Sequence, residues 1–319
     1  MDDVSFSTEA LTTARKESST LKAVQSEERN ETKFKFVSRN SIEEEQKIRK
    51  NRINGVCQKE PELQGNLFYR DTFAHMYVID KYKLLFCYIP KVGCSNWKRV
   101  LMVLSGRKKT IENITSHEAH AHNGLRLFRR LNNWQQKYAL KNYRKVMFVR
   151  EPFARILSAY KNKYGDLEVY RNAPPNFHIY ATRIIRKYRE NPSSDALLTG
   201  ENITFAEFVE YLTDQRERPN FDRHWKEMYK LCSPCNVKYD FIGKLENLEE
   251  EANYVLGSVP GVRDIVSYPA KANSHPTNTS VDIVKETLSP FSDEKLLQLW
   301  DIYKLDFNLF GYDKPSFIP

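Results

Sequence analysis

Two stretches of this 319-residue chain share one order of features: an apolar run of strand length, a short turn with a basic residue, and a helical pattern. The first begins with "KYKLLFCYIP" over 81–90, an apolar run closed by proline, which predicts a strand buried on both faces. Helical spacing follows from Trp97 to Leu104 and stops at Gly106. The chain therefore contains at least one strand–turn–helix unit.

The second unit is "YRKVMFVREPFARILSAYKNKYG". Val146 to Val149 form its predicted strand, and Pro152 stands where the first turn of a helix tolerates proline. Apolar residues then recur at helical spacing up to Gly165. Two such units predict an α/β fold with a parallel sheet, in which ligands collect at the carboxyl ends of the strands.

The net charge of +9 is distributed unevenly. Residues 1–60 hold 12 Lys or Arg and 11 Asp or Glu, so +8 belongs to the remainder, which favours an anionic ligand over a basic tail. Residues 1–60 are polar and predict a flexible, largely disordered stem, although "SIEEEQKIRKNR" from Ser41 predicts a helix. No repeat or low-complexity linker follows, so 61–319 is expected to be one domain.

Targeting signals are weak. No stretch approaches the roughly 18 apolar residues that cross a bilayer, and no signal-peptide pattern opens the chain, so the chain as written is expected to be soluble or truncated. Four Asn-x-Ser/Thr sequons mildly favour a secretory lumen. They stand at Asn30, Asn113, Asn202 and Asn278.

Three later helices have visible start signals. Thr204 with Glu207 and Asn247 with Glu250 have the spacing of a capping box. Ser292 can cap "DEKLLQLWDIYKL". The amphipathic pattern of these helices predicts packing elements.

The turn after the first strand has the composition of a phosphate cradle. A helix N-terminus offers unpaired N–H groups and a partial positive charge to an anion. Gly93 lets the main chain come close, Ser95 adds a hydroxyl donor, Lys91 adds a charge and Trp97 offers a flat surface for a base or sugar. The Gly-x-x-x-x-Gly-Lys-Ser/Thr pattern of ATP-binding loops is absent, which weakens an ATP site and a small-molecule kinase.

The second turn offers side chains to a phosphate. Arg150 ends the strand and Ser158 lies two helical turns further on, a pair that suits a terminal phosphate. Arg155 is expected either to assist or to be a solvated surface charge. Two cradles at the ends of adjacent strands predict a ligand with two separate phosphate groups.

These residues carry a family resemblance. "PKVGCSNWKR" is similar to the 5′-phosphosulfate-binding motif of carbohydrate sulfotransferases, and "FVREPFARILSAYKNKY" resembles their 3′-phosphate-binding motif. The nearest group contains the chondroitin, dermatan and N-acetylgalactosamine 4-O-sulfotransferases and the HNK-1 sulfotransferase of the Golgi. The likeness covers roughly residues 81–315, through "HWKEMYKLCSPC", "YDFIGKLENLEEEANYVL" and "YKLDFNLFGYDKP". The chain is identified as a member of this family.

The resemblance implies a P-loop-like sulfotransferase fold with a central parallel sheet flanked by helices, and 3′-phosphoadenosine 5′-phosphosulfate (PAPS) as co-substrate. Lys91 and nearby amides would hold the 5′-phosphosulfate and stabilise charge on the leaving oxygen. Arg150 and Ser158 would hold the 3′-phosphate. The residues expected to bind the donor are Pro90, Lys91, Val92, Gly93, Cys94, Ser95, Asn96, Trp97, Arg150, Glu151, Pro152, Arg155 and Ser158.

The acceptor hydroxyl needs a base, and "SHEAHAHNGL" supplies three histidines, His117, His120 and His122. The resemblance favours His120 as general base, beside Lys91 as the second catalytic residue. Glu118 is the second candidate base. Exposed loop histidines without a catalytic role remain the alternative.

A zinc site is the competing interpretation of the histidines, but their spacing fits no standard pattern and only one Cys-x-x-Cys occurs, so no metal is expected. In a lumenal enzyme, Cys232 and Cys235 are expected to form disulfides with each other or with Cys57. Cys94 is expected to have a packing role.

His224 and Trp225 could line a glycan groove or lie in the core. The expected acceptor is a glycosaminoglycan or glycoprotein glycan, most readily the 4-hydroxyl of N-acetylgalactosamine in chondroitin, dermatan or N-glycan chains. The alternatives are the glucuronate 3-hydroxyl, as in the HNK-1 type, or a non-catalytic glycan-binding protein.

Other functions fit the chain less well. A metal-dependent glycosyltransferase would need an Asp-x-Asp motif, which is absent, and no nucleic-acid-binding motif is present. Family members are single-pass type II Golgi membrane proteins, so the resemblance implies the Golgi lumen and a membrane anchor that this chain does not show.

Overall fold

The computed structural model describes residues 41–63, 71–269 and 279–319. The chain divides into two compact units, residues 1–48 and 49–319. In the first unit the described residues, 41–48, are helical, as predicted from Ser41 onward. Residues 49–59, at the start of the second unit, are helical too. Most of the predicted disordered stem lies outside the described residues.

A five-stranded sheet with the order β3-β1-β2-β4-β5 forms the centre of the second unit. Strands β2, β4 and β5 are parallel, which confirms the predicted parallel centre. Strands β1 and β3 are antiparallel additions at one edge and were not predicted. The strands are β1 (Met76–Ile79), β2 (Leu84–Cys87), β3 (Arg126–Leu127), β4 (Arg144–Val149) and β5 (Phe241–Lys244).

The helices pack around the sheet and continue below its carboxyl edge. The helices that precede or follow the strands in sequence are α2 (Thr72–His75), α3 (Cys94–Leu104), α4 (Ser116–Ala121), α5 (Asn133–Asn142), α6 (Pro152–Lys163), α11 (Met228–Cys232), α12 (Pro234–Val237) and α13 (Leu248–Ser258). The others are α7 (Leu167–Arg171), α8 (Pro175–Tyr188), α9 (Ser194–Thr199), α10 (Phe205–Thr213), α14 (Val281–Leu288) and α15 (Asp293–Phe310). Short 3-10 turns occupy Pro61–Leu63, Asp80–Tyr82, Phe128–Arg130, Arg218–Asn220 and Leu245–Asn247.

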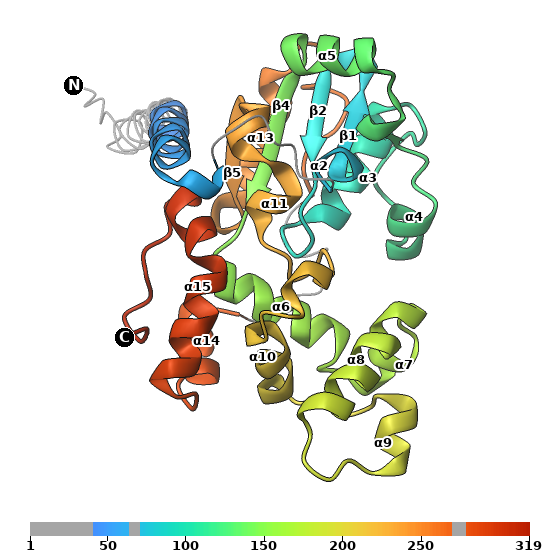
Figure 1. Ribbon diagram of the computed structural model, residues 1–319. Helices are drawn as coiled ribbons and strands as arrows, with labels where there is room; N and C mark the ends of the chain where they lie inside the picture. Colours follow the sequence, from blue (N-terminus) through green and yellow to red (C-terminus); the bar gives the residue numbers. More distant parts are fainter. Residues whose placement is uncertain (1–40, 64–70, 270–278) are drawn as a thin grey trace, which may run out of the picture. The chain divides into compact units, whose positions relative to one another are not determined.

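Both predicted strand–turn–helix units are present, as β2–α3 and β4–α6. Strand β2 is shorter than the apolar run because Lys83, in the left-handed region at φ 46°, ends the preceding 3-10 turn. In the register of the parallel strands, Phe86 lies opposite Val146. Figure 1 shows β2 and β4 running from α5 toward α6, so their carboxyl ends meet at the edge that faces the helices.

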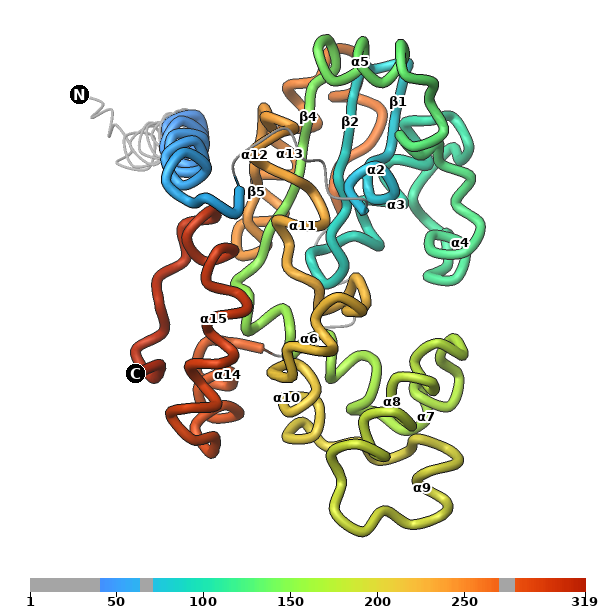
Figure 2. Tube along the Cα trace, viewed as in Figure 1, coloured from blue at the N-terminus to red at the C-terminus, as the bar shows by residue number. Residues whose placement is uncertain are grey.

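Aromatic side chains form the core of the helical region beyond this edge. Figure 2 shows the path of α6, α8, α10 and α15, which supply most of this core. Trp225 is completely buried at its centre, with its ring centroid 5.1 Å from Tyr180 and 5.4 Å from Phe208. The core alternative is therefore confirmed for Trp225. This core fixes α6, which follows the second cradle, in place.

The predicted caps have different outcomes. Thr204 and Glu207 form a complete capping box, and Ser292 caps α15, as predicted. The prediction of a capping box at Asn247 is wrong, because the chain enters α13 directly from a 3-10 turn and the side chain of Asn247 makes no cap hydrogen bond.

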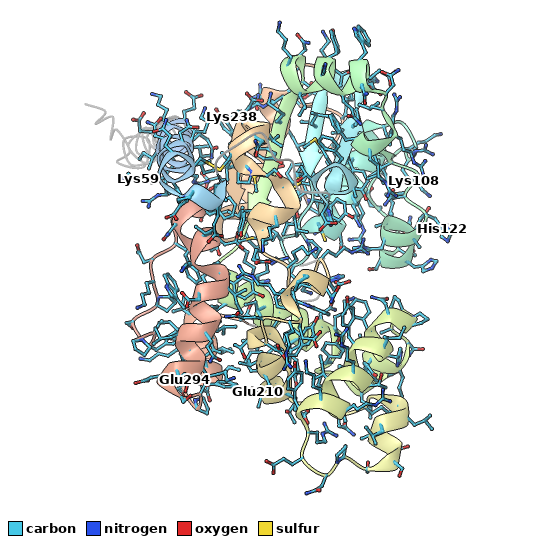
Figure 3. The ribbon with its side chains drawn as sticks, viewed as in Figure 1. Lys59, Lys108, His122, Glu210, Lys238 and Glu294 are labelled. Atoms are coloured by element: carbon cyan, nitrogen blue, oxygen red, sulfur yellow. A yellow bond between two sulfur atoms is a disulfide. The ribbon has the colours of Figure 1, made fainter. Side chains whose placement is uncertain are left out.

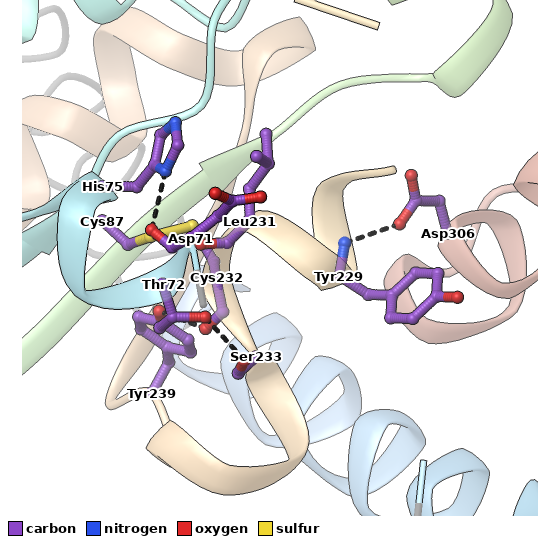
Figure 4. Close-up of a disulfide and its surroundings, with 10 residues drawn as sticks. All are labelled: Asp71, Thr72, His75, Cys87, Tyr229, Leu231, Cys232, Ser233, Tyr239 and Asp306. Carbon is purple, nitrogen blue, oxygen red and sulfur yellow. Dashed lines mark hydrogen bonds between the residues drawn. A yellow bond between two sulfur atoms is a disulfide. The ribbon is translucent and has the colours of Figure 1, made fainter. Parts of the chain in front are cut away.

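Two disulfides link distant parts of the second unit, Cys57–Cys235 and Cys87–Cys232. The first is one of the predicted alternatives, whereas the pairing of Cys87, in the buried strand β2, was not predicted. Figure 4 shows the Cys87–Cys232 bridge beside the buried hydrogen bond between Thr72 and Ser233. Closing loops of this length stabilises a fold by about 5 kcal/mol in the chain-entropy model. Among the described residues, no helix combines the length and apolar character needed to cross a membrane.

Candidate active site

The turn between β2 and α3 has a strained backbone that brings the main chain close to the site. Lys91 and Gly93 both lie in the left-handed region, at φ 70° and 66°. A Cβ on Gly93 would stand 2.6 Å from Leu248 Cδ2 and 2.7 Å from the hydroxyl of Tyr268, so only glycine fits.

The N-terminus of α3 is open. Gly93 is the N-cap residue and has no side chain to cap the helix, and the first helical bond runs from the amide of Trp97 to the carbonyl of Gly93. The amides of Cys94, Ser95 and Asn96 therefore precede the first helical hydrogen bond. An anion at this point would gain those donors and the positive end of the helix dipole.

Lys91 adds a side-chain cation that has neither an ion-pair partner nor a hydrogen bond within the described ranges. Burial, and then the neighbouring cations Lys163 and Arg150, lower the pKa of Lys91 to about 8. A half-buried lysine held near like charges gains when an anion binds beside it. Cys94, the first residue of α3, is a partly exposed free thiol.

The prediction that Trp97 offers a flat surface to a base or sugar is wrong. Trp97 is completely buried between Phe86, Phe148 and Tyr268, with ring centroids 4.5, 5.1 and 5.3 Å away, so it presents no surface to a base or sugar. The helical period places it with the apolar face of α3 that packs on the sheet. Asn96 is also buried, and its side chain accepts a hydrogen bond from Arg99 at 2.6 Å.

Arg155 is not a solvated surface charge, because it is 1% exposed. Its guanidinium donates to three carbonyl oxygens, those of Pro90 at 3.1 Å and of Arg223 and Lys226 at 2.8 Å. It therefore joins α6 to the first turn and to the segment before α11. These bonds hold the turn in place, and Pro90 and Val92 are buried as well.

Arg150 brings the two predicted cradles into contact. It follows β4 directly, and its guanidinium donates to the carbonyl of Lys91 at 3.0 Å and to the hydroxyl of Thr279. Burial lowers its pKa from the ordinary arginine value. Ser158, two turns along α6, is buried. The structure thus places Lys91 and Arg150 at one edge of the sheet, as the two strand–turn–helix units predicted.

The N-terminus of α6 is closed by its own N-cap residue. Glu151 accepts a hydrogen bond from the amide of Ala154 at 2.5 Å, and Pro152 occupies the first helical position. Burial, opposed by the amide hydrogen bonds and reinforced by the nearby Glu246, raises the pKa of Glu151 to about 7. This helix end offers little to an anion beyond the side chain of Arg150.

His120 reaches the site from α4. Its Nε2 lies 2.8 Å from the hydroxyl of Ser95, and its Nδ1 lies 3.0 Å from Nζ of Lys98. The residue as a whole is exposed, but both ring nitrogens are engaged. Desolvation, followed by the charge of Lys98, lowers the pKa of His120 to about 3, so the ring is neutral at pH 7.

The contacts define which nitrogen carries the proton. An ammonium group has only donors, so Lys98 donates to Nδ1 of His120, and Nε2–H then donates to Ser95. In this arrangement the ring has no free acceptor. It can take a proton at Nδ1 only after the contact with Lys98 is released.

The other candidate bases lie away from the site. Glu118 pairs with Lys108 at 2.5 Å, and the rings of His117 and His122 contact each other at a tilt of 56°, with centroids 5.3 Å apart. Figure 3 shows His122 on the side of α4 that faces away from the sheet. Among the described residues, His120 is the one predicted histidine that the structure brings to the turn between β2 and α3.

Three further cations border the site and were missed by sequence reasoning. Lys98 is buried with Nζ 4.7 Å from the ring of Tyr88, and Lys163 lies 4.3 Å from the ring of Phe177. Arg223 lies 3.5 Å from the hydroxyl of Tyr88. Lys98 stands one helical turn after Ser95, which was an available signal, whereas Arg223 is placed by tertiary contacts alone.

Comparison with known proteins decides the family. A model of the sulfotransferase family matches residues 74–313. The chain belongs to the sulfotransferase family. It is 38% identical to carbohydrate sulfotransferase 11 of Mus musculus over 85% of this chain and 77% of that protein. It is 38% identical to carbohydrate sulfotransferase 14 of Danio rerio (85% and 72%) and 36% identical to carbohydrate sulfotransferase 9 of Homo sapiens (86% and 61%). No solved structure matches the chain significantly.

Within the described part of this sulfotransferase, no group of three His, Cys, Asp or Glu side chains could hold a metal ion. Cys232 and Cys235 are each in a disulfide, which removes them as zinc ligands. His224 lies at the border of the site instead, with Nδ1 2.5 Å from Asp222. Burial lowers the pKa of His224 to about 4.

Proposed function

We propose that this sulfotransferase transfers the sulfuryl group of PAPS to a sugar hydroxyl, and that the acceptor is the 4-hydroxyl of N-acetylgalactosamine in chondroitin or dermatan chains. The observation that carries the proposal is the convergence of Lys91, Arg150 and His120 at one edge of the sheet, beside an open helix N-terminus. The names of the related proteins support a carbohydrate acceptor.

The residues at the edge fit a nucleotide with two phosphate centres. Lys91 and the open amides of α3 would hold the 5′-phosphosulfate, where Gly93 admits the anion close to the main chain. Arg150 and Ser158 would hold the 3′-phosphate. Arg155 would act by positioning the first turn through the carbonyl of Pro90.

In the proposed reaction the acceptor oxygen forms a bond to sulfur as the bond between sulfur and the 5′-phosphate oxygen breaks. The electron pair of the broken bond goes to that phosphate oxygen, where Lys91 stabilises the charge. The proton of the acceptor hydroxyl goes to the ring of His120. The products are the sulfate ester and the nucleotide 3′,5′-bisphosphate.

Besides placing the sulfuryl group, binding of the donor would change the basicity of His120. A ring with a pKa of about 3 is a weak base, and Ser95 and Lys98 occupy both of its nitrogens. An anion held beside Ser95 and Lys98 would compete for both groups, free the ring and raise its pKa. We expect His120 to become a competent base once the donor is bound.

The two disulfides support an oxidising compartment, and the sequon residues Asn113 and Asn202 are exposed. We propose the Golgi lumen as the place of action, in line with the family resemblance.

Transfer of radiolabelled sulfate from PAPS to a panel of desulfated glycans tests the proposal. We expect incorporation into desulfated chondroitin and dermatan, at the 4-position of N-acetylgalactosamine. Incorporation into glucuronate-terminated glycans alone would contradict the acceptor, and incorporation into none of the panel would contradict the activity.

A further inference from the structure

A long basic segment lies mostly outside the site described above, which takes only His120 and Arg150 from its two ends. Between Glu118 and Glu151 the chain has eight Lys or Arg and no Asp or Glu. Some of these cations have structural partners, such as Arg126 with Asp80 and Lys145 with Asp240. Those on the 3-10 turn Phe128–Arg130 and on α5 do not.

One face of α5 combines aromatic and basic side chains. Trp134, Lys137, Tyr138 and Lys141 follow one another at i, i+3, i+4 and i+7, the spacing of a single helix face, and all four are exposed. Trp134 is 71% exposed and Tyr138 41%. Their rings stack with centroids 5.5 Å apart and planes 14° from parallel. An exposed aromatic pair of this size is uncommon on a surface that covers nothing.

Arg129 and Arg130 lie on the 3-10 turn that shortly precedes α5 in the chain. Both are exposed. The turn that carries them is tied to α5 by the capping box of Asn132 and Gln135 and by the side chain of Gln136, which donates to the carbonyl of Leu131 at 3.0 Å. Across the chain as described, Arg129, Arg130, Lys137 and Lys141 take part in no ion pair. The face therefore carries uncompensated positive charge on a rigid support.

The same residues lead toward the catalytic site. Arg129 is near enough to Tyr88 for its charge to act on the phenol. Tyr88 in turn lies beside Arg223 and Lys98, which border His120. Cations thus continue from the site past Tyr88 to α5.

We propose that Arg129, Arg130, Trp134, Lys137, Tyr138 and Lys141, here called the α5 surface, bind the chain of a linear anionic polysaccharide outside the catalytic site. The cations match carboxylate or sulfate groups spaced along such a chain, and the stacked rings offer flat apolar faces to sugar rings. This inference rests on the proposed function, because it concerns the acceptor of that reaction.

The position of α5 makes the surface selective for long acceptors. Figure 1 shows α5 at the amino end of β4, whereas the site lies at the carboxyl end. Six residues of β4 span about 20 Å at roughly 3.3 Å per residue. Only an acceptor of several sugar units reaches both the site and α5, so the α5 residues Trp134, Lys137, Tyr138 and Lys141 would act on polymers and leave short oligosaccharides unaffected.

The test compares two triple variants of the full chain. In one, Trp134→Ala, Lys137→Ala and Lys141→Ala remove part of the α5 surface. The matched control replaces an equally exposed apolar residue and two exposed cations elsewhere, as Ile179→Ala, Arg186→Ala and Lys59→Ala; Figure 3 labels Lys59. We expect KM for polymeric desulfated chondroitin to rise about tenfold in the first variant alone, with kcat and the KM of a chondroitin tetrasaccharide unchanged.

Direct binding separates this inference from the proposed function. Polymer affinity is measured without donor, at low and high salt, and the α5 variant is expected to lose affinity and salt dependence. That loss would stand even if the wild type transferred no sulfate, a result that contradicts the proposed function alone. Equal polymer KM and affinity in the two triple variants would overturn the α5 surface. So would a loss of binding to vesicles of phosphatidylserine and phosphatidylcholine with polymer binding unchanged.

Discussion

The two strand–turn–helix units of this sulfotransferase have the same topology, but the N-terminus of the helix is open in one unit and capped in the other. The N-terminus of α3 is open because its N-cap residue is Gly93, whereas the N-terminus of α6 is closed by the carboxylate of Glu151. The first turn can therefore bind an anion with main-chain amides, and the second depends on a side chain, Arg150. A shared local fold does not imply a shared way of holding phosphate.

The largest expected effect comes from the residue that connects the two units. Arg155→Met would leave the carbonyls of Pro90, Arg223 and Lys226 without their donor, and we expect a loss of about 3 to 5 kcal/mol in the free energy of unfolding. Urea unfolding measures this loss. Replacement of the exposed Arg186 by alanine, Arg186→Ala, is the control. If Arg155→Met changed the free energy of unfolding as little as the control does, the turns after β2 and β4 would be independent of each other.

The next largest effect is the loss of nucleotide affinity when the cation of either cradle, Lys91 or Arg150, is removed. Lys91→Ala and Arg150→Ala are each expected to weaken binding of 3′-phosphoadenosine 5′-phosphate by about 2 to 4 kcal/mol. The arginine variant should lie at the upper end, because the closed end of α6 offers no amides in its place. Isothermal calorimetry decides the order, with Lys59→Ala as control. A larger loss for Lys91→Ala would reverse the comparison, and unchanged affinity in both would refute the donor site.

Loss of the proposed base, His120, is expected to lower the rate of sulfate transfer without changing the affinity for the donor nucleotide. His120→Ala should cut sulfate transfer by about a hundredfold while nucleotide affinity stays nearly intact. Lys98→Met should raise the pKa of His120, because it removes the second-largest cause of the low value, and so shift the acid limb of the kcat/KM profile to higher pH. Transfer at the wild-type rate in His120→Ala would exclude this residue as the base.

The smallest effect concerns the cap of the second unit. The pKa of Glu151 is raised to about 7 in the folded state from 4.5, so the unfolded chain releases this proton first and stability falls as pH rises between about 4.5 and 7. Glu151→Gln keeps an oxygen for the amide of Ala154 but cannot ionise. Its melting temperature should therefore fall less than that of the wild type between pH 5 and pH 8. The same decrease in both proteins would mean that Glu151 is not the titrating group.

Local patterns were enough to predict the elements that build the site. The apolar run before Pro90, the strand at Val146–Val149 and the caps at Thr204 and Ser292 were predicted because each depends on neighbours in sequence. The antiparallel edge strands were missed. Strand β3 has only two residues, too few for a periodic pattern.

The side chains whose environment depends on distant segments could not be predicted. The burial of Arg155 requires three carbonyls brought together from two other segments, and Cys87 pairs across 145 residues. Trp97 is different, because it falls on the same helical stripe as Val100 and Leu101, and that stripe already indicated a packed residue. The contact of His120 with Ser95 depends on tertiary packing of α4 against α3.

The bridge between Cys87 and Cys232 has a consequence for where the enzyme can work. Cys87 is the last residue of β2, three positions before Pro90, so this covalent link ties the start of the donor turn to the segment that precedes β5. Synthesis in a reducing cytosol would deliver a protein whose catalytic edge lacks that tether. Complete formation of the catalytic edge is thereby coupled to oxidation of these two thiols.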